Sequence, residues 1–106
     1  MGGAEMRTAA DQPLTKDQIS AGRWIAWMPS GDRVAGATGE IEIIGEIGPH
    51  NMGGHVVLAQ VECIASATAE IEGDNVDDAW RIAMARALET AARCLRHAAR
   101  AFGGGR

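Results

Sequence analysis

The strongest pattern of hydrophobic and polar positions lies near the C-terminus. Apolar residues recur there at steps of four or three, and neither Pro nor Gly interrupts residues 75–102. This spacing predicts an amphipathic α-helix, because residues three and four apart share one face of a helix. Asp74 or Asn75 is a suitable N-cap, and the glycines at 103–105 end the helix. The apolar stripe consists of Val76, Trp80, Met84, Leu88, Ala91, Leu95, Ala98 and Phe102.

Two earlier segments have the pattern of β-strands. Residues 23–28 are apolar and rich in aromatic side chains, and the turn-forming residues 29–32 follow them. Residues 40–47 begin with strict alternation, which is typical of a strand with one face on the core and one in water. The second strand therefore directs its isoleucines towards a core. It directs its acidic residues, Glu40, Glu42 and Glu46, towards solvent.

The segment 55–72 is also strand-like, and it follows a glycine-rich loop over residues 48–54. Ordinary strands span about five or six residues, so this segment is too long for a single one. It forms either one bent strand or two strands, with the bend expected at residues 66–68. Together these elements predict an α+β fold, in which a three- or four-stranded antiparallel sheet packs against one long C-terminal helix.

The length of 106 residues fits one domain. Residues 1–13 are small and polar and predict a disordered lead, residues 14–102 the domain, and residues 103–106 a flexible tail. No apolar run approaches the roughly 18 residues of a membrane span, and residues 1–13 lack the pattern of a signal peptide. We therefore expect a cytoplasmic protein without a membrane partner.

The predicted helix is longer than the sheet that covers it. At about 1.5 Å per residue it measures roughly 42 Å, whereas a strand of five or six residues spans about 17–20 Å. The N-terminal turn, a bend in the helix or a second copy of the chain must cover the excess. We expect a homo-oligomer that associates through the helix stripe or a sheet edge. The residues expected at this interface, or in the core, are Trp80, Met84, Leu88, Leu95 and Phe102, with the core favoured for the first three.

Charge divides the chain into two parts. Residues 1–80 carry four basic and thirteen acidic side chains, for a net charge of −9, and residues 81–106 carry six arginines and one glutamate, for +5. Arginines suit phosphate groups, so one hypothesis is a nucleic-acid-associated protein that uses Arg86, Arg93, Arg96 and Arg100. A solvated helix face is the favoured interpretation, and an acidic protein surface is a third. The acidic face of the strand, Glu40, Glu42 and Glu46, supports a further hypothesis, a small inhibitor that docks on a basic partner protein.

No motif in the sequence indicates catalysis or metal binding. Cys63 and Cys94 are too few for a disulfide framework. His50, His55 and His97 lack the spacing of zinc ligands. Nucleophile elbows and zincin motifs are absent from the sequence. The sequence therefore favours a non-enzymatic interaction module without cofactor or metal.

One segment resembles a known family. Residues 70–73 and the small and apolar positions that follow are similar in spacing to the last strand and helix of the double-stranded-RNA-binding domain, over about twenty residues. These positions are Ala79, Ala83, Ala87 and Leu88. That family places lysines at the start of this helix to hold phosphates, whereas Asp77 and Asp78 occupy the region here. The resemblance therefore implies a fold class and does not bring the RNA-binding activity with it.

Overall fold

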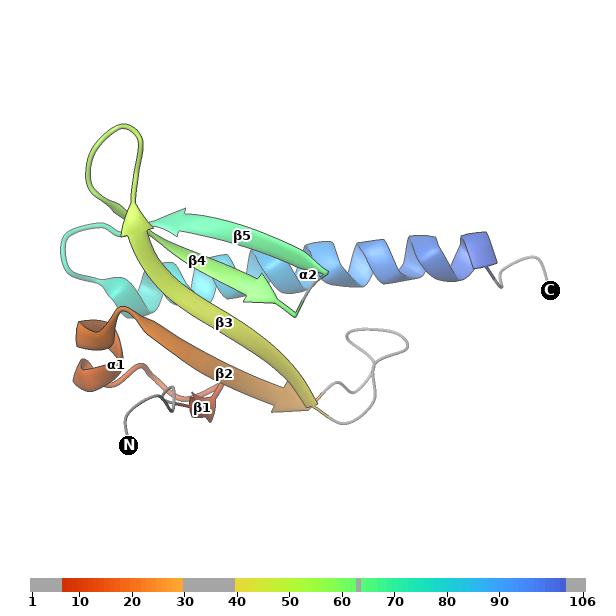
Figure 1. The fold of residues 1–106 in the computed structure, drawn as a ribbon, viewed down its shortest axis with the longest axis horizontal. Coiled ribbons are helices and arrows are strands. Elements are labelled where there is room, and N and C mark those ends of the chain that lie inside the picture. Colours follow the sequence, from red (N-terminus) through yellow and green to blue (C-terminus); the bar gives the residue numbers. More distant parts are fainter. Residues whose placement is uncertain (1–6, 30–39, 63, 103–106) are drawn as a thin grey trace.

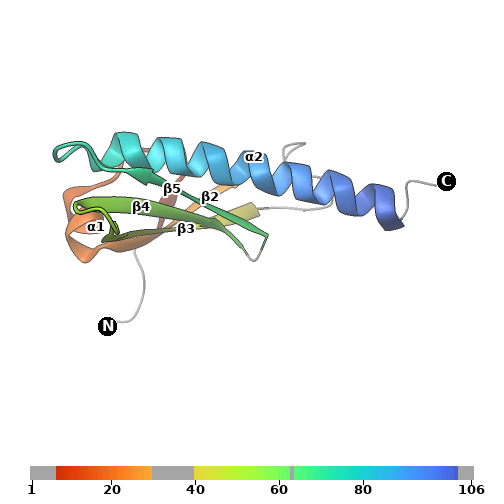
Figure 2. The same cartoon turned by 90° about the horizontal axis from the view of Figure 1, so that it is seen from above.

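The computed structural model describes residues 7–29, 40–62 and 64–102, with side chains described as far as Cys94. Five strands form one sheet in sequence order, in which β1 runs parallel to β2 and every other neighbouring pair is antiparallel. Within these described ranges, one long helix lies on one face of the sheet, mainly over β4 and β5 (Figures 1 and 2). The elements are β1 (Arg7–Ala9), α1 (Lys16–Ala21), β2 (Arg23–Pro29), β3 (Glu40–Pro49), β4 (His55–Val61), β5 (Ala65–Glu70) and α2 (Val76–Phe102).

The prediction of an α+β fold with a sheet packed on a C-terminal helix is confirmed. The sheet has five strands, however, and one neighbouring pair is parallel. The extra strand is β1, which lies within the predicted disordered lead at residues 1–13. A strand of three residues is too short to show an alternation of apolar and polar positions. β1 is held in place by pairing with β2 and by a hydrogen bond that Ala10 N donates to the carbonyl of Trp27, at 2.7 Å.

The segment 55–72 contains two strands, and the turn between them comes earlier than expected. Glu62 has a φ of 47°, and Ile64 N donates to the carbonyl of Val61 at 3.0 Å. Residues 66–68, where the bend was predicted, lie inside β5 instead. Ser, Ala and Thr are compatible with extended backbone, so the side chains there do not mark the turn.

The core lies between α2 and the facing side of the sheet. Alternate residues of the strands point into it, and the buried face of α2 consists largely of alanines, which let the helix approach the sheet closely. Trp24 of β2 and Trp80 of α2 meet edge to face, with ring centroids 5.4 Å apart. The largest fully buried side chains are Trp24, Trp80, Ile41, Ile43, Val57 and Val61.

The short helix α1 sits near the start of α2. Thr15 caps it through a reciprocal pair of hydrogen bonds with Gln18, and Gly22 ends it in the left-handed conformation. Leu14 N donates to the Asp77 carboxylate at 3.0 Å, which links this region to the first turn of α2. Leu14 and Ile19 pack against the core, so α1 belongs to the same folded unit.

Candidate functional site

The helix α2 leaves the sheet after Ala91. Ala91 is fully buried, whereas Cys94, three residues later, is exposed. Residues three apart differ by only about 60° around a helix axis. Ala91 and Cys94 therefore both lie on the side of α2 that faces the sheet in the preceding turns of the helix. The helix continues to Phe102 and projects past the end of the sheet (Figure 1). The described sheet therefore covers the first part of α2 but not its C-terminal end.

The predicted interface residues separate into two groups along α2. Trp80 and Met84 are 1% and 8% exposed and lie in the core of the single chain, while Leu88 is partly buried against it. The side chains of Leu95 and Phe102 lie outside the described ones, so their placement stays a prediction. Of the predicted interface residues, Leu95 and Phe102 are therefore the ones that remain for an interface on the projecting end of α2.

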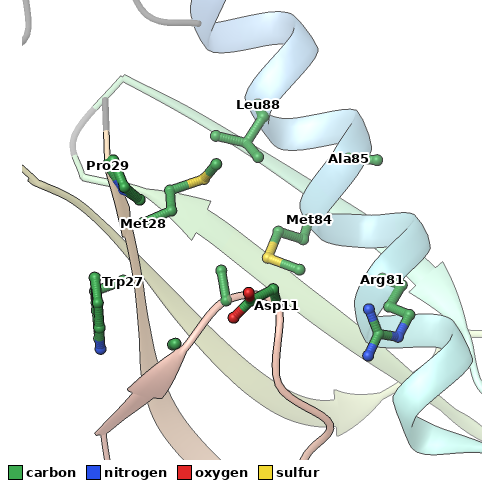
Figure 3. A pocket seen from close by; sticks show the side chains of 10 residues that line it. Asp11, Trp27, Met28, Pro29, Arg81, Met84, Ala85 and Leu88 are labelled. Carbon is green, nitrogen blue, oxygen red and sulfur yellow. The ribbon is translucent and has the colours of Figure 1, made fainter. Parts of the chain in front are cut away.

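A groove adjoins the apolar stripe where α2 passes the end of β2. It has a volume of about 530 Å³ and is lined by Met84, Ala85 and Leu88 of α2, by the last residues of β2, and by the residues around the end of β1. Figure 3 shows the side chains of Met28, from β2, and Leu88, from α2, pointing toward one another. The walls are mainly apolar, and Asp11 and Arg81 supply the charged groups of its lining.

Sequence reasoning missed this groove for a topological reason. One of its walls requires the end of β1 to lie beside β2, and residues 7–9 carry no periodic signal. The other wall belongs to the apolar stripe of the helix. The one feature of the sequence that could have indicated the groove is the position of Leu88 at the edge of the apolar stripe.

The described arginines of α2 have partners within the chain. Arg81 pairs with Asp77 at 3.0 Å, and Arg93 lies 3.9 Å from Glu89, each one helical turn away. Arg86 donates to the backbone carbonyl of Thr68 at 3.0 Å. The side chains of Arg96 and Arg100 lie outside the described ones. Among the described residues, therefore, the predicted anion-binding arginines do not converge on one point.

The contact from Arg86 has a structural role at the edge of the sheet. β5 is the last strand of the sheet, and exposed edge strands are templates for pairing with other chains. Arg86 reaches over this edge and occupies the outward carbonyl of Thr68. The arginine therefore blocks one of the backbone groups that a foreign strand needs.

We expect Arg86→Ala to form β-rich aggregates faster than the wild-type protein, because the carbonyl of Thr68 becomes available. Loss of the hydrogen bond should lower the free energy of unfolding by only about 1 kcal/mol. Thioflavin T fluorescence over time measures the aggregation. Arg81→Ala is the matched control, since it removes the same charge without touching the edge. Equal aggregation of the two variants contradicts the edge role.

The acidic residues of β3 share their face of the sheet with basic side chains. Arg7 of β1 forms ion pairs with Glu40 and Glu42, at 2.9 and 3.1 Å. Glu46 lies directly opposite Arg23 of β2 in the strand register. These side chains are on the face opposite α2, because the intervening residues Ile41 and Ile43 are buried beneath the helix. Arginines from two neighbouring strands thus offset the negative charge of the predicted docking face.

Other features of the described chain point to no chemistry. Across the described ranges, no group of three or more His, Cys, Asp or Glu side chains is placed to hold a metal ion. A second groove, of about 330 Å³, lies between the start of α2, the last part of β3, the start of β4 and the residues that follow β5. None of the helices in the described part of the chain is long and apolar enough to cross a membrane.

Comparison with known protein families, curated proteins and solved structures finds no match for this chain.

Proposed function

We propose that the protein is a non-enzymatic interaction module that self-associates through the projecting end of α2. The change from buried Ala91 to exposed Cys94 carries this proposal. Beyond that point the sequence continues the apolar stripe with Leu95, Ala98 and Phe102. Burying a Leu or Phe side chain contributes roughly 1.5–3 kcal/mol, so this segment gains stability from a covering surface.

The spacing of the stripe supports a second helix as that surface. From Met84 to Phe102 the apolar positions alternate steps of four and three, which is the pattern of helices that pack along a common seam. A second copy of the chain carries the same stripe. A two-fold arrangement covers both projecting ends at once and closes the assembly as a dimer.

The two alternative functions have less support. Arg86 and Arg93 have partners within the chain, which weakens the proposal of a nucleic-acid interface on the arginine face. Arg7 offsets Glu40 and Glu42, which weakens the proposal of an acidic docking face. Both stay predictions, and the oligomeric state tests the proposed self-association.

We expect the wild-type protein to be a dimer in size-exclusion chromatography coupled to light scattering, at low and at high salt. Apolar association changes little with salt, whereas contacts between exposed charges weaken. Leu95→Asp should raise the dimer dissociation constant by at least about tenfold, because it places a charge in the apolar seam.

The matched control is Ile82→Asp. Ile82 is 47% exposed and lies on the same helix, so the variant introduces the same charge away from the seam. It should remain a dimer, and circular dichroism checks that all variants are folded. A wild-type protein that is monomeric at every concentration and salt contradicts the proposed function.

A further inference from the structure

We infer that the groove beside Leu88 receives the C-terminal end of α2 from a second copy, bound in the antiparallel direction. The inference rests on the proposed function and specifies which surfaces meet. The groove is the site of the receiving copy, and residues 95–102 are the segment of the incoming copy.

The groove and the stripe form one continuous surface along α2. Met84 and Leu88 line the groove, and both are also members of the apolar stripe that runs on to Phe102. A helix packed along the stripe beyond Ala91 therefore reaches the groove without changing direction. Grooves of this kind bind helices that present apolar anchors three, four and seven residues apart. Leu95, Ala98 and Phe102 have these spacings.

The antiparallel direction follows from the positions of the anchors. With Leu95 opposite its own symmetry mate, Phe102 lies level with Leu88 of the partner subunit, since both are seven residues from Leu95. In a parallel pair Phe102 meets Phe102 instead. It then lies about 21 Å along the helix axis from the partner's Leu88, at 1.5 Å per residue. Of these two pairs, the antiparallel one places Phe102 at the groove of the partner subunit.

The charged groups that line the groove are Asp11 and Arg81, so the lining itself carries one charge of each sign. The incoming segment contains Arg96 and Arg100 and no acidic residue, whereas residues 1–80 of the receiving chain carry a net charge of −9. Opposite charges on two surfaces speed their association.

Cysteine cross-linking on the full-length chain tests the geometry. In a background of Cys63→Ser and Cys94→Ser, a chain with Ala85→Cys is mixed with a chain with Phe102→Cys and treated with a short bis-maleimide. We expect a heterodimeric product from this pair, because Ala85 lines the groove. The control pair combines Ile82→Cys with Phe102→Cys and should give less product, since Ile82 does not line the groove.

Substitution at the lining of the groove gives a second, independent measurement. Ala85 is exposed, so Ala85→Glu should leave the fold intact. It should raise the dimer dissociation constant by about tenfold, as expected for a charge placed within an interface. Ile82→Glu is the control and should leave the constant unchanged.

The outcomes separate the inference from the proposed function. A dimer that gives no product between positions 85 and 102 and tolerates Ala85→Glu overturns the groove inference and leaves self-association standing. Efficient cross-linking of Phe102→Cys to itself indicates a parallel pair and also overturns the inference. A monomeric wild-type protein removes both proposals. If Ala85→Glu lowers the melting temperature of the monomer instead, a segment of the same chain fills the groove, which again overturns the inference.

Discussion

Trp80→Ala is expected to lower the free energy of unfolding by about 3–5 kcal/mol, the range for removing a buried large aromatic side chain. Trp80 is 1% exposed and meets Trp24 edge to face. Truncation leaves a cavity between α2 and the sheet and removes a favourable ring contact. A small domain typically has a total stability of about 5–15 kcal/mol, so this loss is a large fraction of it.

Urea denaturation followed by far-ultraviolet circular dichroism measures this effect. All samples need the same protein concentration, because association also contributes to the apparent stability. Ile82→Ala is the control on the same helix, and its exposed side chain should change stability by less than about 0.5 kcal/mol. If Trp80→Ala unfolds at the same urea concentration as the control, α2 does not pack on the sheet as described.

Gly45→Ala is expected to lower the free energy of unfolding by about 1–3 kcal/mol or more, the range for overpacking a core. Gly45 of β3 lies directly opposite Trp24 of β2, and a Cβ atom at this position overlaps the Trp24 indole. The indole is fully buried, so it has no open space into which it can move. Relief therefore requires a shift of β2 or of the helix above it.

Gly48→Ala is the matched control on the same strand. No atom lies within 4 Å of a Cβ built at Gly48, so the same methyl group meets no neighbour there. Its stability should stay within about 0.5 kcal/mol of the wild-type value. Equal unfolding midpoints for the two variants would show that the indole yields to the added methyl group.

These core positions bear on the proposed function. Trp80 and Met84 already hold α2 to its own sheet, and a substitution there destabilises the chain before it reports on association. Leu95, Ala85 and Ile82 are therefore the informative positions for assembly. Ala85 and Ile82 are exposed, so their variants separate binding from folding.

Two large elements were predictable from the chain alone. The helix Val76–Phe102 was expected at residues 75–102, and β3 was expected from the alternation of residues 40–47. Both are long enough to repeat a period several times, and burial of one face imposes that period on the sequence. The projection of α2 beyond the sheet was also predictable from the number of residues in the helix, because the rise per residue is a property of the helical backbone.

The sequence by itself thus determined the α+β class, the long helix and its apolar stripe. Only the tertiary structure decided where β1 pairs, how Arg86 reaches Thr68 and that Met28 and Leu88 face one groove. These contacts join residues far apart in the chain, and each depends on a few atoms rather than on a repeated pattern. Local periodicity reports which face of an element is buried, whereas the partner of each face is set by the packing of the whole domain.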